Sequence, residues 1–227
     1  MAYNDGLDLA AAKLVHELRE LRVRYETDWE MQDVYERIHL AENFLRTHEL
    51  TVEKLMKGDA IEKSLEDDPK VLLGLELASA LAGRYGHSGI LGDLELQLNI
   101  LRRAIALPCD IGISIPIRCD LSRALILYFQ RTRSTDSIDE AVMLNTHSLI
   151  NAPEGHLLHP QVLSCQAEAL MQRGDVIGQR EDVSQSLSMA EKAVELLTPS
   201  SLYYYTSQFG LARALTCLLY TSDAADE

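Results

Sequence analysis

The chain has 227 residues, of which 47% are hydrophobic and 25% are charged, a composition typical of a folded protein and not of a disordered one. Its formal net charge of −14 argues against nucleic acid or an anionic membrane surface as a partner, because both require a basic surface. The four cysteines form no closely spaced pair, and no apolar run is long enough to span a bilayer. We therefore expect reduced thiols and a cytoplasmic protein.

Residues 10–50 are predicted to form a diverged unit of two helices. Leu21 is followed at fixed offsets by Arg24-Tyr25 and Asp33-Val34, and the same residue types recur at the same offsets after Leu81. Self-similarity at fixed offsets is the signature of stacked structural repeats.

Residues 51–68 separate this unit from the more regular ones. The distance from Leu21 to Leu81 is 60 residues, which leaves room for about one extra helical segment. The segment is rich in Glu, Lys and Asp and is predicted to be an acidic helical insert. Its Glu66-Asp67-Asp68 run lacks the alternating ligands and the glycine of a calcium loop, so we interpret it as negative charge before a helix that starts at Pro69.

Residues 69–220 contain the clearest repeat. An Ala-Leu pair recurs at spacings of 44, 45 and 45 residues, with a small residue three positions before each leucine. The leucines, which we call the anchor leucines, are Leu81, Leu125, Leu170 and Leu215. The pattern predicts two-helix units at 69–115, 116–159 and 160–198, and a half unit at 199–220. Because one hairpin cannot bury its own apolar face, we expect neighbouring units to stack.

The unit at 116–159 shows how each hairpin is expected to form. Pro116 is predicted to start the first helix, and Leu125 is predicted to lie on its buried face. Ser137 and Glu140 fit a capping box at the start of the second helix. The second helix is predicted to end at Asn151-Ala-Pro153, because the residue before proline avoids helical geometry.

This pattern resembles the tetratricopeptide repeat, in which residues of alternating size mark both helices. The first-helix set is matched by Leu121, Ser122 and Leu125. The second-helix set is matched in spacing by Ala141, Asn145, Ser148 and Pro153. Asn145 departs from the aromatic residue expected at its position, and the period departs from about 34 residues in that family.

The longer period resembles degenerate repeats that precede CHAT-type, caspase-like domains in fungal proteins. The resemblance spans roughly residues 14–219 and depends on Leu77-Ala78-x-Ala80-Leu81-x-x-Arg84-Tyr85 and His159-Pro160. It implies an all-α, right-handed α-solenoid that acts as a protein-protein interaction scaffold for a protein or peptide partner. The alternative is a regulatory or sensor segment of a multidomain protein with a CHAT-type peptidase effector, in which the repeats contact another domain of the same chain.

The half unit 199–220 is predicted to have no second helix and to expose Leu211, Leu215 and Leu218. Residues 221–227 are predicted to be a disordered or artefactual tail, because the final LLYTSDAADE resembles translated sequencing-adaptor text. We therefore expect the chain to be a fragment of a longer protein.

A candidate binding site comes from the position after the small residue of each first helix, which lines the concave groove in such stacks. Arginines stand there at Arg19, Arg123 and Arg213, beside Ser79 and Glu168 in other units. Since guanidinium groups bind carboxylates through paired hydrogen bonds, these arginines are predicted to form a peptide-binding clamp. The alternative is a set of solvated or neutralised surface charges.

Other candidate chemistry is interpreted as structural. His156, His159 and Cys165 supply three of the four ligands that a zinc site needs, so no metal is predicted. The sequence has no phosphate-binding glycine loop, dinucleotide fingerprint or zinc-protease motif, so we predict no cofactor, no catalytic residues and no enzyme activity. Tyr203-Tyr204-Tyr205 is interpreted as a helix start that covers the preceding unit, with a ligand platform as the alternative.

Overall fold

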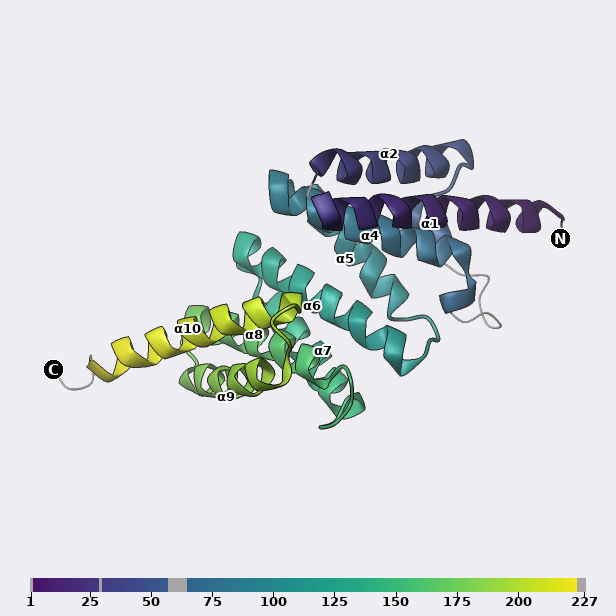
Figure 1. Ribbon diagram of the computed structural model, residues 1–227. Coiled ribbons are helices and arrows are strands. Elements are labelled where there is room, and N and C mark those ends of the chain that lie inside the picture. Colours follow the sequence, from purple (N-terminus) through teal and green to yellow (C-terminus); the bar gives the residue numbers. More distant parts are fainter. Residues whose placement is uncertain (1, 29, 57–64, 224–227) are drawn as a thin grey trace. The chain divides into compact units, whose positions relative to one another are not determined.

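The computed structural model describes residues 2–28, 30–56 and 65–223 (Figure 1). Within these ranges the regular elements are all helical and no strand occurs, which confirms the predicted all-α class for the described residues. The chain divides into two compact units, residues 1–110 and residues 111–227. Each unit is described separately.

The first unit is built on three long helices that pack against one another, α1 (Ala2–Asp28), α2 (Met31–Thr47) and α4 (Pro69–Ser88). Figure 1 shows α1 and α2 running side by side. The short elements α3 (Val52–Leu55) and η1 (Leu65–Asp67) lie against α4, and α5 (Leu91–Ala104) pairs with α4 as a hairpin. Helix α1 starts well before residue 10, the predicted beginning of this unit.

Helix α4 shows why these segments are helical. Asp68 caps its start by accepting a hydrogen bond from the Lys70 amide at 2.9 Å, and Pro69 occupies the first turn, as predicted. Leucines four residues apart then face the core, and Gly89 ends the helix in the left-handed conformation with φ of 67°. Of the predicted insert 51–68, the stretch 57–64 lies outside the described residues.

The second unit contains α6 (Ile111–Thr132), α7 (Thr135–Asn151), α8 (His159–Ile177), α9 (Arg180–Leu196) and α10 (Leu202–Asp223). Consecutive helices pack against each other, and the first helices also pack in a row, α6 on α8 and α8 on α10 (Figure 1). Helix α7 ends at Asn151 and Pro160 lies in the first turn of α8, as the sequence predicts.

Two local predictions in this unit are wrong. Helix α6 starts at Ile111, so Pro116 lies inside it and not at its start. Burial of Ile115 and Ile117 on either side favours the helix there, and the missing proline N–H costs only one hydrogen bond near the helix start. Ser137 is not a cap: α7 starts at Thr135, and Ser137 is buried in its first turn with its amide bonded to the Ser134 carbonyl at 3.1 Å.

The predicted apolar face is confirmed in three of the two-helix repeats. Leu81, Leu125 and Leu170 are at most 2% exposed, and the small residues before them are buried as well. Leu215 on α10 differs, since 45% of it is exposed. Helix α10 continues to Asp223, past the predicted start of the tail at 221, and residues 224–227 lie outside the described part of the chain.

Candidate functional site

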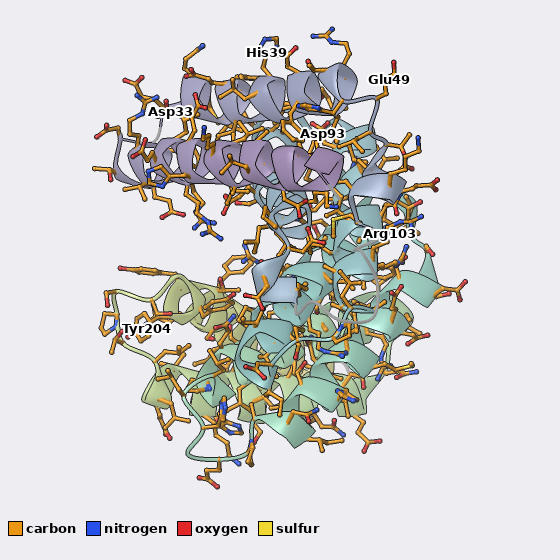
Figure 2. All side chains as sticks on the ribbon, turned by 90° about the vertical axis from the view of Figure 1, so that its right-hand side faces the viewer. Asp33, His39, Glu49, Asp93, Arg103 and Tyr204 are labelled. Carbon is orange, nitrogen blue, oxygen red and sulfur yellow. The ribbon has the colours of Figure 1, made fainter. Side chains whose placement is uncertain are left out.

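An arginine and an aspartate nine residues apart join the two helices of three hairpins. In unit 1 the pairs are Arg24–Asp33 at 2.6 Å and Arg84–Asp93 at 2.6 and 2.8 Å, and Figure 2 labels both aspartates. In unit 2 Arg173 bonds Asp182 at 2.6 and 3.0 Å. Each aspartate is buried near the start of the second helix.

These ion pairs hold the two helices of each hairpin together, so their arginines are already engaged and are not free to bind a ligand. The hydrogen bonds that Arg84 and Arg173 donate to Asp93 and Asp182 raise the pKa of each arginine, so the guanidinium groups stay charged. In the hairpin of α6 and α7 the same two positions are Tyr128 and Ser137, so both members are replaced together. The constant spacing was visible in the sequence, but it did not predict the ion pair.

A second cluster in unit 1 brings three arginines onto one carboxylate. Glu76 of α4 accepts from Arg19 at 3.2 Å and from Arg22 at 3.1 and 3.3 Å, both on α1. Arg37 of α2 donates to the Glu76 carboxylate at 3.1 Å and to the Glu76 carbonyl at 3.2 Å. We call Arg19, Arg22, Arg37 and Glu76 the arginine cluster.

The arginine cluster is buried at one end and open at the other. Arg37 is 2% exposed, and its burial lowers its pKa against the opposing attraction of Glu76. The side chains of Arg19 and Arg22 are 48% and 37% exposed, so their guanidinium groups reach the surface. The repeat spacing predicts Arg19 as a site residue but not Arg22 and Arg37, because their shared partner Glu76 is 54 and 39 residues away in the chain.

In unit 2 the other two predicted arginines lie on either side of Glu168 of α8. Arg123 of α6 lies 3.7 Å from Asp120 and 5.9 Å from the centre of the Tyr203 ring. Arg213 of α10 bonds Asp175 at 2.7 Å. Burial raises the pKa of Glu168, although both arginines act to lower it. Arg123 and Arg213 thus both act electrostatically on Glu168, while their ion pairs are with Asp120 and Asp175, and Arg19 belongs to the other unit.

Neutral side chains form the buried core of this part of unit 2. Cys119 and Cys165 are buried together, and the hydrogen bond between the thiols together with burial raises the Cys165 pKa. Tyr203 packs on this cluster and its hydroxyl accepts from Gln161 at 2.8 Å, so it covers the preceding hairpin as predicted. All four cysteines are free of disulfides.

The two candidate metal-binding histidines hold the turn between α7 and α8. His159 Nδ1 is 2.7 Å from the Ala152 carbonyl, and His156 Nδ1 accepts from the Leu158 amide at 3.1 Å. Cys165 instead forms its side-chain hydrogen bond with Cys119, in the core that also includes Ala152 of this turn. Among the residues the structure describes, no three His, Cys, Asp or Glu side chains lie close enough to hold a metal ion.

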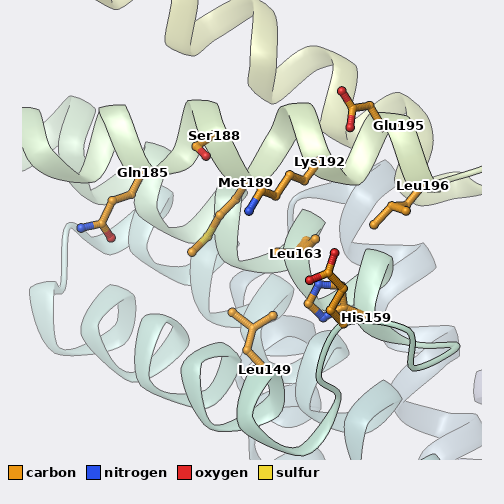
Figure 3. Close-up of a pocket in the computed structure, with 10 residues that line it drawn as sticks. Leu149, His159, Leu163, Gln185, Ser188, Met189, Lys192, Glu195 and Leu196 are labelled. Atoms are coloured by element: carbon orange, nitrogen blue, oxygen red, sulfur yellow. The ribbon is translucent and has the colours of Figure 1, made fainter.

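A groove of about 530 Å³ lies between α7, α8 and α9. Figure 3 shows Leu149 of α7 and Met189 of α9 facing each other across it, with Lys192 beside them. Its lining mixes apolar residues with both signs of charge, so it selects no ligand by charge alone.

No family model, curated protein or solved structure matches this chain. Within the described part of the chain, no helix is both long and apolar enough to cross a membrane. A function therefore has to be proposed from the geometry of the charged residues.

Proposed function

We propose that this chain is a protein-protein interaction scaffold, a right-handed α-solenoid of tetratricopeptide-like repeats that binds an acidic segment of a partner. The observation that carries the proposal is the arginine cluster. Three guanidinium groups share Glu76, and even with Glu26, 3.7 Å from Arg22, the group keeps an excess of positive charge. We propose a cytoplasmic location and no catalytic role.

The chemistry of the cluster fits a carboxylate ligand. A guanidinium group has five N–H donors arranged to bind carboxylates through two parallel bonds. Arg19 and Arg22 each direct part of their donors to Glu76 while remaining about half or one-third exposed. Because the whole chain carries a net charge of −14, an acidic segment is repelled elsewhere and attracted here.

The test is a fluorescence anisotropy titration of the full chain with a labelled peptide rich in glutamate and alanine. We expect the double variant Arg19→Gln, Arg22→Gln to bind about tenfold more weakly, equivalent to about 1.4 kcal/mol. The matched control is the double variant Arg131→Gln, Arg133→Gln. Both arginines are exposed; Arg131 lies in the last turn of α6 and Arg133 directly follows the helix. Equal affinity of both double variants for the peptide contradicts the proposal.

A separate variant tests the predicted clamp residues of unit 2. Arg123→Glu reverses the charge beside Glu168, so it should weaken peptide binding if Arg123 contributes to the site. Unchanged affinity restricts the site to the arginine cluster.

The second candidate is the regulatory or sensor segment of a larger protein with a CHAT-type peptidase effector. The specific observation that favours it is the exposed apolar face of α10, which another domain of the same chain could cover. Fusion of that domain should then protect α10 from hydrogen exchange, and unchanged exchange contradicts this candidate.

A further inference from the structure

Helix α10 has two apolar faces, and α8 and α9 cover only one of them. Ser207 bonds Ser164 at 2.8 Å, and Ala214 is buried against Met171 and Val183. Tyr205 and Phe209 on the other side are 63% and 67% exposed. Ala212 and Leu215 continue that side at helical spacing and are also exposed. We call Tyr205, Phe209, Ala212 and Leu215 the α10 stripe.

The positions equivalent to Phe209, Ala212 and Leu215 are buried on the two preceding first helices. Ser164, Ala167 and Leu170 of α8 correspond to Phe209, Ala212 and Leu215 at the repeat spacing of 45 residues. All three are at most 2% exposed, and so are their counterparts on α6, which are Cys119, Ser122 and Leu125.

Hydrogen bonds identify two kinds of cover for those positions. The next first helix covers Ser164, because Ser207 of α10 bonds it at 2.8 Å, and the second helix covers the small residue. Ser186 of α9 donates to the Ala167 carbonyl at 2.7 Å, and Asn145 of α7 donates to Ser122 at 2.7 Å. In both hairpins the helix that follows the first helix therefore packs over the small residue. On α10 the matching residue is Ala212, which no second helix covers among the described residues.

The α10 stripe is also free of charge in a strongly acidic chain. Apart from Asp223 at its last position, the one charged residue of α10 is Arg213, and Arg213 bonds Asp175. Covering the stripe removes apolar surface from water without burying a carboxylate, so the hydrophobic gain is not offset by desolvation of charge.

We propose that the α10 stripe is the docking site for an amphipathic helix of a partner protein, which packs on α10 as α9 packs on α8. Helix α9, which covers α8, defines the chemistry of that partner, a large aliphatic residue followed by small residues at +3, +7 and +10. In α9 these residues are Val183, Ser186, Ala190 and Ala193.

Among the residues that the structure describes, a second copy of this chain offers no unpacked second helix of that kind. The described second helices α2, α5, α7 and α9 are each packed on their own first helix. The proposal is independent of the acidic-segment proposal, because the stripe shares no residue with the arginine cluster.

The experiment uses the full chain and a labelled peptide of residues 179–198, stapled through exposed positions 191 and 195 to hold it helical. We expect saturable binding with a Kd of about 10 µM, weakened at least about tenfold by Ala212→Glu. The matched control is Ala12→Glu, which places the same charge on an exposed alanine of α1. Circular dichroism melts establish that both variants are folded, and the acidic peptide should bind Ala212→Glu as it binds the unmodified chain.

Three results overturn the proposal. The first is no binding of the helical peptide at about 1 mM, and the second is equal binding by Ala212→Glu and the unmodified chain. The third comes from sedimentation velocity of the chain alone, where we expect a monomer. A dimer that Ala212→Glu dissociates would assign the stripe to a second copy of this chain.

Discussion

The two units hold their first helices together with different polar chemistry at the same repeat position. Five residues before the anchor leucine, unit 1 has Glu76, a buried carboxylate shared by three arginines. In unit 2 the matching residues are Asp120, which is exposed, and Cys165, which is buried and hydrogen-bonded to another thiol. The repeat thus conserves the apolar spacing and leaves the polar residues between first helices free to vary. Those residues decide how each unit responds to charge removal, salt and pH.

The largest effect should come from Glu76→Gln in unit 1. The substitution leaves Arg37 charged and buried without its carboxylate, which costs about 3–5 kcal/mol of unfolding free energy. Urea denaturation measures the loss. Asp120→Asn removes a carboxylate from the equivalent, exposed position of unit 2, so its cost should stay below about 0.5 kcal/mol. Equal costs would abolish the distinction between the units.

Leu125→Ala should be nearly as destabilising, because Leu125 is completely buried. We expect a loss of about 2–5 kcal/mol from the cavity and the lost apolar contacts. Leu215→Ala at the equivalent position of α10 should cost less than about 1 kcal/mol, since this leucine is half exposed. A melting temperature for Leu125→Ala within about a degree of that of the unmodified chain contradicts the packing described here.

The neutral polar contact of unit 2 should have a smaller effect. Asn145 donates to Ser122 at 2.7 Å, and its Oδ1 is buried without a hydrogen-bond partner in the structure. Ser122→Ala leaves the amide without this contact and should cost about 1–3 kcal/mol, whereas adding Asn145→Leu should recover most of that loss. Additive losses in the double variant, measured by urea denaturation, would show that the pair is not coupled.

The smallest effect should be on pH dependence. The pKa of Glu168 is raised above its ordinary value of 4.5, so the folded chain binds this proton more tightly than the unfolded chain. The contribution of Glu168 to stability is therefore greatest at low pH and falls as the pH rises through its folded pKa. Glu168→Gln should therefore raise the melting temperature more at pH 7 than at pH 4. An equal change at both pH values contradicts the raised pKa.

Much of the fold could be predicted because the repeat is local. Periodic leucines and small residues indicate which side of each helix is buried, and together with the prolines they located the anchors, the end of α7 and the start of α8. The start of α6 was missed because burial of Ile115 and Ile117 outweighs the usual position of a proline.

Less of the candidate site could be predicted, because it depends on contacts between helices. Arg37 and Glu76 are 39 residues apart, and no sequence period relates them. The Arg173–Asp182 pair had a visible spacing, yet spacing alone does not show that two side chains meet. Sequence patterns give the face of a residue, whereas its partner follows from how the helices pack.

Binding of an acidic segment by the arginine cluster, as we propose, should weaken with salt because it depends on charge. The most direct measurement is the affinity of the unmodified chain and of Arg19→Gln, Arg22→Gln for the glutamate-rich peptide, at about 20 and 300 mM salt. We expect tighter binding at low salt for the unmodified chain, and a smaller salt dependence for the double variant. Identical affinities and identical salt dependence in both proteins would contradict the proposal.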